Sequence, residues 1–280
     1  MDVYAALQAA QTALKASNPS GEEKQEAQLL LAQLLGVNHA WLIAHAHDAL
    51  AAENQQAFQA LVQRRMQGEP IAHILGERDF YGLTFKVTPD TLIPRPDTET
   101  LVEAALAKLP LAKNLEVLDL GTGSGAVALA IAYHRPQVQM TAVDCSEKAL
   151  TIAKQNAQQL KMHQVGFVLS DWFDALADQT FDMIVSNPPY VEAHDAHLSQ
   201  GDLRFEPLSA LVAGTDGLAD IRLMIKAATK HLKPQGWLML EHGYQQASQV
   251  ASLFSAAGFS HIQHGLDLAG IQRVTLGQCR

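Results

Sequence analysis

The stretch LDLGTGSGAVALAIA, residues 118–132, joins an apolar run to an Ala-rich run through three glycines. The apolar run predicts a buried strand, and the Ala-rich run after Gly125 predicts a helix. Glycines between them let the backbone turn sharply and let a ligand lie against main-chain atoms. The stretch therefore predicts a strand–loop–helix turn of an α/β sheet, with a ligand at the carboxyl end of the strand.

Strands and helices alternate on both sides of this stretch. The apolar runs that predict strands cover residues 116–120, 139–144, 165–171, 181–187, 236–242 and 273–278. The segments that predict helices cover residues 124–135, 146–160, 219–232 and 245–258. Strands that alternate with helices at this spacing indicate a parallel sheet with helices on both faces. The fold class is therefore α/β, with a doubly wound, Rossmann-like domain.

The residues before the α/β region have a different composition. Residues 1–75 are rich in Ala, Leu and Gln and predict a small helical domain, with one helix ending at Gly36. Residues 76–97 predict a β-hairpin, over 78–87, and a proline-rigid connector. The α/β domain then covers 98–280 and opens with a helix that Asp97 or Thr98 is expected to cap.

The overall composition is that of a globular protein with a negative net charge. The chain has 280 residues, 48% of them apolar, and a formal net charge of −9. This charge disfavours a surface made to grip nucleic-acid phosphates. Two cysteines and scattered histidines predict no disulfide framework and no metal site. With no secretory signal and no membrane-spanning run, we expect a cytoplasmic monomer without a membrane partner.

The glycine loop itself distinguishes between cofactors. Its spacing is G-x-G-x-G rather than the G-x-G-x-x-G that is typical of dinucleotide-binding enzymes. Asp119 stands just ahead of the loop, where a carboxylate would repel a pyrophosphate. It suits a ligand that carries a cation, such as the amino-acid end of S-adenosylmethionine.

Acidic residues follow at the ends of the next two predicted strands. Asp144 is placed to accept hydrogen bonds from both ribose hydroxyls, although it is equally suited to cap the helix that follows. Asp171 is placed to accept from an adenine amino group, and Trp172 to line the ring. Because the carboxyl ends of these strands share one crevice, we expect Asp119, the glycines, Asp144 and Asp171 to converge.

The sequence NPPY, residues 187–190, closes the fourth predicted strand. Pro188 and Pro189 hold the chain extended, so the Asn187 side-chain oxygen and the Pro188 carbonyl can accept both hydrogens of one planar NH₂ group. Tyr190 offers a flat face to stack on that group. The segment therefore predicts a clamp that orients an amide, aniline or exocyclic amine for methyl transfer. The alternative is a rigid strand exit without a catalytic role.

These motifs together resemble Rossmann-type S-adenosylmethionine-dependent methyltransferases that act on planar nitrogens. Two further segments, TLIPRPDTETLVE at 91–103 and LRFEPLSALVAGTDGLADIR at 203–222, resemble the peptide chain release factor glutamine methyltransferases, the PrmC or HemK family. That resemblance covers essentially the whole chain. It implies a transferase of translation termination that methylates the glutamine amide in the Gly-Gly-Gln motif of class-1 release factors and leaves S-adenosylhomocysteine.

The resemblance also implies roles for residues. Asn187 and the Pro188 carbonyl would hold the glutamine amide, with Pro189 and Tyr190 beside it, and the helical domain would dock the release factor. Glu206 would either cover the glutamine or serve the structure, and Arg95 is the charged residue of the connector that is suited to meet an anion. The resemblance implies a cofactor-binding role for Gly121, Thr122, Gly123, Ser124, Gly125, Asp144, Trp172 and Asn187, and the positions of Asp119 and Asp171 add these two carboxylates to the predicted cofactor site.

Two other functions remain open on the motifs alone. A methyltransferase acting on an exocyclic amine of a base in DNA or ribosomal RNA would need a basic face and room for a flipped base. A binding module that has kept the fold without catalysis would be expected to lose part of the set formed by the glycine loop, Asp144 and NPPY. The acidic composition disfavours the first, and the complete set disfavours the second.

Overall fold

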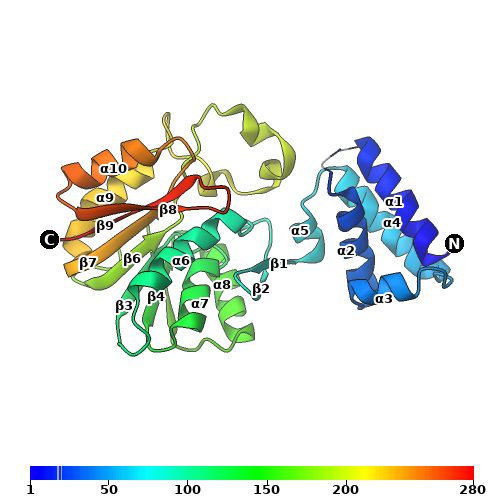
Figure 1. The fold of residues 1–280 in the computed structure, drawn as a ribbon, viewed down its shortest axis with the longest axis horizontal. Helices are drawn as coiled ribbons and strands as arrows, with labels where there is room; N and C mark the ends of the chain where they lie inside the picture. The colour runs from blue at the N-terminus through cyan, green and yellow to red at the C-terminus, as the bar shows by residue number, and fades with distance from the viewer. Residues whose placement is uncertain (18, 20) are drawn as a thin grey trace. The chain divides into compact units, whose positions relative to one another are not determined.

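The structure, a computed structural model, describes residues 1–17, 19 and 21–280 and divides into two compact units (Figure 1). The helical unit consists of Met1–Glu77 together with His197–Phe205. The sheet unit consists of Arg78–Ala196 and Glu206–Arg280. Each unit has a hydrophobic core of its own, so the two are described separately.

The helical unit is built around amphipathic helices with small and branched apolar residues on their inner faces. Its helices are α1 (Val3–Ser17), α2 (Glu23–Leu35), α3 (His39–Ala44), α4 (Ala52–Met66) and α5 (Ile71–Leu75). Leu30, Leu31 and Phe58 are among the side chains that fill the core between α1, α2 and α4. Gly36 ends α2 in the left-handed conformation, which agrees with the helix end predicted there.

The sheet unit contains a two-stranded hairpin, a seven-stranded sheet and the helices that cover it. The strands are β1 (Glu77–Phe80), β2 (Leu83–Lys86), β3 (Glu116–Leu120), β4 (Gln139–Asp144), β5 (Val165–Leu169), β6 (Phe181–Ser186), β7 (Leu232–Glu241), β8 (Ser260–Leu266) and β9 (Gln272–Gln278). The α-helices are α6 (Glu99–Lys108), α7 (Ala126–His134), α8 (Glu147–Gln159), α9 (Ala219–His231) and α10 (Ala247–Ala256). Its 3₁₀ turns are η1 (Pro96–Thr98) and η4 (Leu208–Ala210), whereas η3 (Gly201–Phe205) and nearly all of η2 (Ala196–Ser199) belong to the helical unit. Across residues 1–17, 19 and 21–280, no helix is long and apolar enough to span a bilayer.

The strand order of the large sheet is β5-β4-β3-β6-β7-β9-β8. The pairs from β5 to β7 are parallel, whereas β9 pairs antiparallel with both β7 and β8. The prediction of a doubly wound α/β domain after a helical domain and a hairpin is therefore confirmed. No sequence pattern predicts β8, and the sheet is parallel only in its first five positions.

Side chains of the central strands alternate between the two faces of the sheet. Val117 and Val185 pack with α6 and α7 on one face. Leu118 and Leu120 pack with α9 and α10 on the other. Figure 1 shows these two helix layers on opposite sides of the strands. Because both faces are buried, the strands read as continuous apolar runs rather than as alternating patterns.

A buried asparagine attaches the hairpin to the sheet. Asn156 on α8 accepts a hydrogen bond from the Lys86 amide at 2.7 Å and donates to the Lys86 carbonyl at 3.0 Å. Its amide also donates to the Ser124 carbonyl of the glycine loop at 2.8 Å. The hairpin, and the connector that follows it, are thereby held beside the loop after β3.

Candidate active site

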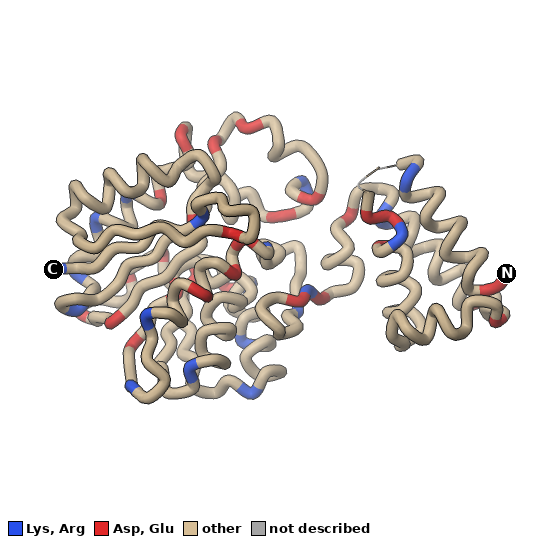
Figure 2. Tube along the Cα trace, in the orientation of Figure 1, with Lys and Arg blue, Asp and Glu red and all other residues tan. Residues whose placement is uncertain are grey.

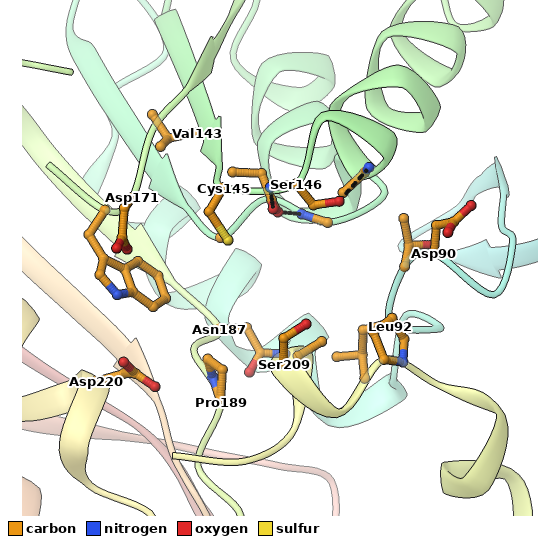
Figure 3. A pocket seen from close by; sticks show the side chains of 18 of the residues that line it. Asp90, Leu92, Val143, Cys145, Ser146, Asp171, Asn187, Pro189, Ser209 and Asp220 are labelled. Atoms are coloured by element: carbon orange, nitrogen blue, oxygen red, sulfur yellow. Dashed lines mark hydrogen bonds between the residues drawn. The ribbon is translucent and has the colours of Figure 1, made fainter. Parts of the chain in front are cut away.

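The candidate site lies where the order of the strands reverses. The chain builds β4 and β5 on one side of β3 and then returns to add β6 on the other side. In open α/β sheets, ligands bind outside the carboxyl ends of the strands at such a switch point. A pocket of about 390 Å³ is present there, with side chains of the connector, the strand ends and the loop after β6 around it (Figure 3). That volume is ordinary for a small-molecule site.

The glycine loop between β3 and α7 forms one wall of the pocket. Gly121 and Gly123 both line it, and Gly121 has a φ of 70°. A Cβ atom on Gly121 would lie 3.2 Å from the Trp172 ring. Glycine is therefore required at 121 for its backbone conformation and for the close approach of the indole. The loop presents main-chain atoms to the pocket.

Asp144 stands at the end of β4 and is fixed by backbone amides. Its Oδ2 accepts from the Gly123 amide at 2.8 Å, and its Oδ1 accepts from the Ser146 amide at 2.9 Å. The cap of α8 is Ser146, whose hydroxyl accepts from the Ala149 amide at 3.2 Å. Burial raises the pKa of Asp144, against the effect of these amides. Asp144 lines the pocket with its carboxylate already oriented.

Asp119 borders a second, smaller cavity of about 50 Å³. Its side chain is 1% exposed, and its Oδ2 accepts from the Thr122 hydroxyl at 2.7 Å. Burial raises the pKa of this carboxyl to about 7. Thr122, Ser124 and Asn187 border the same cavity. A cation placed there would stabilise the ionised carboxylate, which is the chemistry that a ligand with an ammonium group needs.

Asp171 and Trp172 follow β5 and line the large pocket. Trp172 has a φ of 43°, an uncommon conformation for a bulky residue, and its ring lies against Gly121. Burial raises the pKa of the nearby Asp220 carboxyl, against a smaller lowering effect of the Trp172 side chain. The strained backbone and the contact with Gly121 hold the indole as a flat wall of the pocket.

The NPPY segment lies after β6, beside the glycine loop. Asn187 borders both cavities, and its Nδ2 donates to the Thr98 hydroxyl oxygen at 3.1 Å. Pro189 lines the large pocket, whereas Pro188 is buried. The Tyr190 hydroxyl donates to Glu241 Oε1 at 3.2 Å, and its ring packs against the core between the sheet, α9 and α10. Burial and the Glu241 carboxyl raise the pKa of Tyr190.

Thr98 corrects one expectation from the sequence. It occupies the position before α6, but its side chain makes no capping hydrogen bond. The hydroxyl instead receives the Asn187 amide, and the side chain is only 4% exposed. The reason is that η1 precedes α6, so Thr98 already has a helical backbone and its hydroxyl faces the interior of the site.

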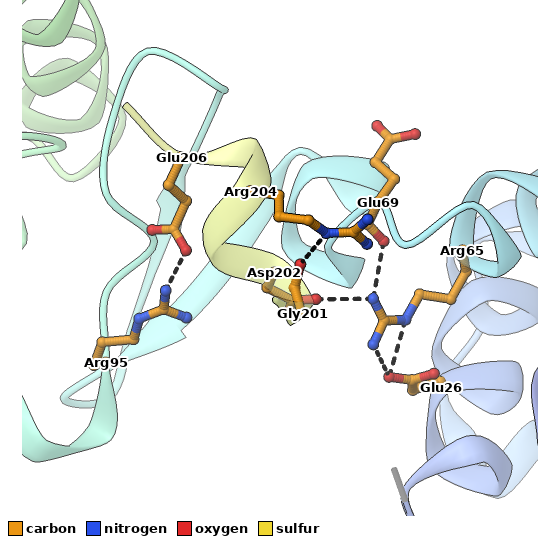
Figure 4. A network of polar contacts seen from close by, with 8 residues as sticks. All are labelled: Glu26, Arg65, Glu69, Arg95, Gly201, Asp202, Arg204 and Glu206. Atoms are coloured by element: carbon orange, nitrogen blue, oxygen red, sulfur yellow. Dashed lines mark hydrogen bonds and ion pairs between the residues drawn. The ribbon is translucent and has the colours of Figure 1, made fainter. Parts of the chain in front are cut away.

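Glu206 and Arg95 lie together in the sheet unit (Figure 4). Glu206 Oε2 accepts from the Ile93 amide at 3.0 Å, and Oε1 pairs with the Arg95 guanidinium. The Glu206 side chain is fully buried. Arg273 pairs with Asp97 at 2.8 Å. These contacts hold both ends of the segment 93–97, and the Arg95 side chain is committed to Glu206.

The pocket is also lined by residues that no sequence motif had indicated. Leu92, Cys145, Ser209 and Asp220 line it (Figure 3). Cys145 follows Asp144 directly, so its place in the pocket could have been predicted from the position of Asp144 at the end of a strand. Ser209 comes from a long loop without a periodic pattern, and Asp220 lies in the first turn of the helix predicted over 219–232, whose pattern does not show that this residue lines a pocket. Only the fold brings them to the carboxyl edge of the sheet.

Comparison with known proteins gives matches to both parts of the chain. Residues 5–76 match the PrmC N-terminal domain, and residues 97–203 match the Methyltransferase small domain. The release factor glutamine methyltransferase of Shewanella oneidensis is 48% identical over 273 residues, which are 98% of this chain and 94% of that protein. The protein of the same name from Escherichia coli (strain K12) is 47% identical and covers 92% of this chain and 93% of its own length.

A solved structure shares the fold at lower identity. The 16S rRNA N2 G1207 methyltransferase of T. thermophilus, solved in complex with AdoMet and guanosine, has a TM-score of 0.55 at 20% identity. The match covers 73% of this chain and 50% of that one. This likeness concerns the fold alone.

Proposed function

The chain belongs to the release factor glutamine methyltransferase family, and from this premise we propose that it methylates the glutamine of the Gly-Gly-Gln motif in class-1 peptide chain release factors. Membership confirms the family resemblance inferred from the sequence motifs, and the chain is a protein-glutamine N-methyltransferase. The methyl donor in this proposal is S-adenosylmethionine, which leaves as S-adenosylhomocysteine.

The observation that carries the proposal is the position of Asn187 at the border of both cavities. The large pocket has the size and the carboxylates for a nucleoside, and the small one ends at the buried Asp119. An acceptor held by Asn187 would therefore lie beside the place where the two parts of the cofactor join.

The residues present fit S-adenosylmethionine. Asp144 would accept from the ribose hydroxyls, Asp171 from the adenine amino group, and Trp172 would cover the ring. Asp119 would face the cationic amino-acid end, and Gly121 and the neighbouring loop atoms would lie against the ligand. When bound, the cofactor supplies a methyl group on a positively charged sulfur.

Asn187 and the Pro188 carbonyl would accept the two hydrogens of the glutamine NH₂ group. Holding both hydrogens in the amide plane directs the nitrogen lone pair toward the methyl group, and this orientation supplies much of the catalysis. The fixed acceptors also stabilise positive charge as it develops on nitrogen. Methyl transfer would form the new N–CH₃ bond as the S–CH₃ bond of the donor breaks, and the nitrogen would then release one proton to water, so no strong base is required of the residues in the site.

The helical unit is the proposed docking surface for the release factor. It matches the N-terminal model of the family, and it presents exposed apolar side chains at Tyr4 and Ile43. Ile43→Asp should raise KM for intact release factor and leave KM for a short Gly-Gly-Gln peptide unchanged. An equal change for both acceptors would argue against this docking surface.

A transfer assay with methyl-labelled S-adenosylmethionine tests the acceptor. Intact release factor, the same factor with its Gly-Gly-Gln glutamine replaced by alanine, ribosomal RNA and duplex DNA are offered separately. Figure 2 shows acidic and basic residues interspersed over the described part of both units, and the net charge is −9. We expect label on the intact release factor alone. Label on nucleic acid would favour the base methyltransferase instead.

A further inference from the structure

Glu241, at the carboxyl end of β7, is a buried carboxylic acid directly behind NPPY. Its side chain is 1% exposed, and its Oε1 accepts from the Tyr190 hydroxyl at 3.2 Å. Its Oε2 is buried without a hydrogen-bond partner in the described part of the chain, and the neighbouring Thr98 hydroxyl lowers the pKa of the carboxyl group. Glu241 borders neither cavity of the candidate site, so it does not reach a ligand there. A buried carboxyl group with one unpartnered oxygen is a costly feature that calls for a role.

Thr98 connects Glu241 to Asn187. A threonine hydroxyl has one hydrogen to donate and lone pairs that accept. When Glu241 is ionised it only accepts, so the Thr98 hydrogen points to the carboxylate and the Thr98 oxygen is left to accept. Its partner is the Asn187 Nδ2, at 3.1 Å. The Asn187 side-chain oxygen is thereby directed away from Thr98.

We propose that Thr98 and Glu241 are positioning residues that fix the orientation of the Asn187 amide, so that its oxygen, rather than its NH₂ group, faces the glutamine. This inference rests on the proposed function, because it assigns a purpose to the clamp at Asn187. An asparagine amide can rotate by half a turn at little steric cost, and the reversed form would present hydrogens to the hydrogens of the acceptor. The relay from Glu241 through Thr98 excludes that form.

The relay has a dependence on pH that follows from its hydrogen bonds. Burial, with a smaller contribution from the facing Asp97, raises the pKa of Glu241 to about 7, against the lowering effects of Thr98, Tyr190 and the Arg273 guanidinium. A protonated Glu241 can donate to Thr98, whose hydrogen is then free to point at Asn187. The amide would reverse to accept it. Turnover should therefore fall as the pH drops below the pKa of Glu241.

Four variants of the full chain test the relay in release factor methylation. Thr98→Val removes the hydroxyl at constant shape, and Thr98→Ser restores it. Glu241→Gln keeps an acceptor for Tyr190 but places a donor toward Thr98, which imitates the protonated acid. Thr100→Val is the matched control, a buried threonine on the adjoining helix α6.

We expect Thr98→Val to lower kcat by about tenfold to a hundredfold, as small losses of alignment do, with unchanged affinity for S-adenosylmethionine by calorimetry. Thr98→Ser should recover most of kcat. Between pH 6 and 8, roughly one unit either side of neutrality, the native enzyme should lose kcat toward the acid end. Glu241→Gln should show a low kcat that does not vary over this range. A native kcat in Thr98→Val, a serine that does not rescue, or a Glu241→Gln profile that still follows the native one would overturn the relay.

A measurement on the protein alone separates this inference from the proposed function. With ¹⁵N-labelled asparagine, the Asn187 side-chain NH₂ resonance is assigned by its loss in Asn187→Asp. It should shift in Thr98→Val and stay unshifted in Thr100→Val. If the Asn187 resonance has the same chemical shift in the native protein, in Thr98→Val and in Thr100→Val, the relay is overturned, whether or not the native enzyme methylates release factor. Failure of the native enzyme to methylate release factor would instead refute the proposed function.

Discussion

Arg65 Nη1 donates to Asp202 Oδ1 at 2.9 Å and so fixes the segment 197–205 to helix α4 within the helical unit (Figure 4). The same guanidinium donates to Glu26 Oε1 at 2.8 Å, and the Arg65 and Glu26 side chains are only 8% and 10% exposed. The segment follows β6 in the sequence and leads directly to Glu206, which binds the Ile93 amide. The Arg65–Asp202 contact therefore holds the segment 197–205 to the other residues of the helical unit.

Replacing Arg65 by methionine should destabilise the protein substantially. The change leaves Glu26 buried without its charge partner, and removal of one partner of a buried pair costs about 3–5 kcal/mol. The free energy of unfolding, from urea titrations of the full chain, measures this loss. Arg64→Met is the control, because its pair with Glu69 is more exposed and such pairs contribute about 0–1 kcal/mol. Equal losses of unfolding free energy in Arg65→Met and Arg64→Met would contradict a stabilising role for the buried Arg65–Glu26 pair.

Asp202→Asn should loosen the segment 197–205 without unfolding the helical unit. Asp202 is the more exposed carboxylate of the two that bind Arg65, so its loss leaves no buried charge unpaired. Hydrogen–deuterium exchange should become faster in peptides covering 197–205 and stay unchanged in the α1 peptide. Native protection of the segment in Asp202→Asn would show that the ion pair does not hold it.

Affinity for S-adenosylmethionine should depend on the ionisation of Asp119. Its pKa is about 7 in the ligand-free protein, because the carboxyl is buried. A bound cation favours the ionised form, so binding below neutral pH requires release of the proton, and the dissociation constant should rise as the pH falls through about 7. Calorimetry in two buffers of different ionisation enthalpy measures the released proton.

Asp119→Asn is the matching variant for that titration. It should weaken binding by about tenfold to a hundredfold, the size expected for a lost hydrogen bond to a charged group, and should abolish the pH dependence. In the ligand-free native protein the folded state holds a proton that the unfolded chain releases, so stability should decrease as the pH rises from about 4 toward 7. If the affinity of the native protein for S-adenosylmethionine does not change from acid to alkaline pH, the cationic end of the ligand does not bind at Asp119.

Gly121→Ala should reduce affinity for the cofactor by displacing Trp172. The added Cβ would meet the indole at 3.2 Å, at a φ of 70° that already disfavours alanine. Gly82→Ala in the hairpin is the control, because it has a similar φ of 75° and open space around the new methyl group. Both variants should lose about 1 kcal/mol of stability from backbone strain, but only Gly121→Ala should bind the cofactor less tightly. Equal affinities would show that the indole does not line the ligand.

Local sequence patterns predicted much of this architecture. The apolar runs around Leu118 and Ile184 are buried on both faces of the sheet, so their strand assignment needed no knowledge of partners. Glycines at the end of β3 and prolines at the end of β6 mark chain turns by their own backbone geometry. By contrast, the segment of β8 alternates between exposed and half-buried residues and has little apolar content, so no strand pattern was visible there.

The polar contacts behind the site could not be read from the sequence. Thr98 and Glu241 are 143 positions apart by their numbers, and each has an ordinary local interpretation, as a helix cap and as a strand end. Arg65 and Asp202 are likewise separated by 137 positions. Their pairing depends on the tertiary fold, and a buried carboxyl such as Glu241 leaves no periodic signal.

The most direct test of the account is the site of methylation on a release factor. The native enzyme and Asn187→Ala are incubated with intact release factor and S-adenosylmethionine, and tandem mass spectrometry locates the methyl group. We predict a methyl group on the side-chain amide of the Gly-Gly-Gln glutamine with the native enzyme, and a rate about a hundredfold lower with Asn187→Ala at nearly unchanged cofactor affinity. A methyl group on another residue, or native turnover by Asn187→Ala, would contradict the account.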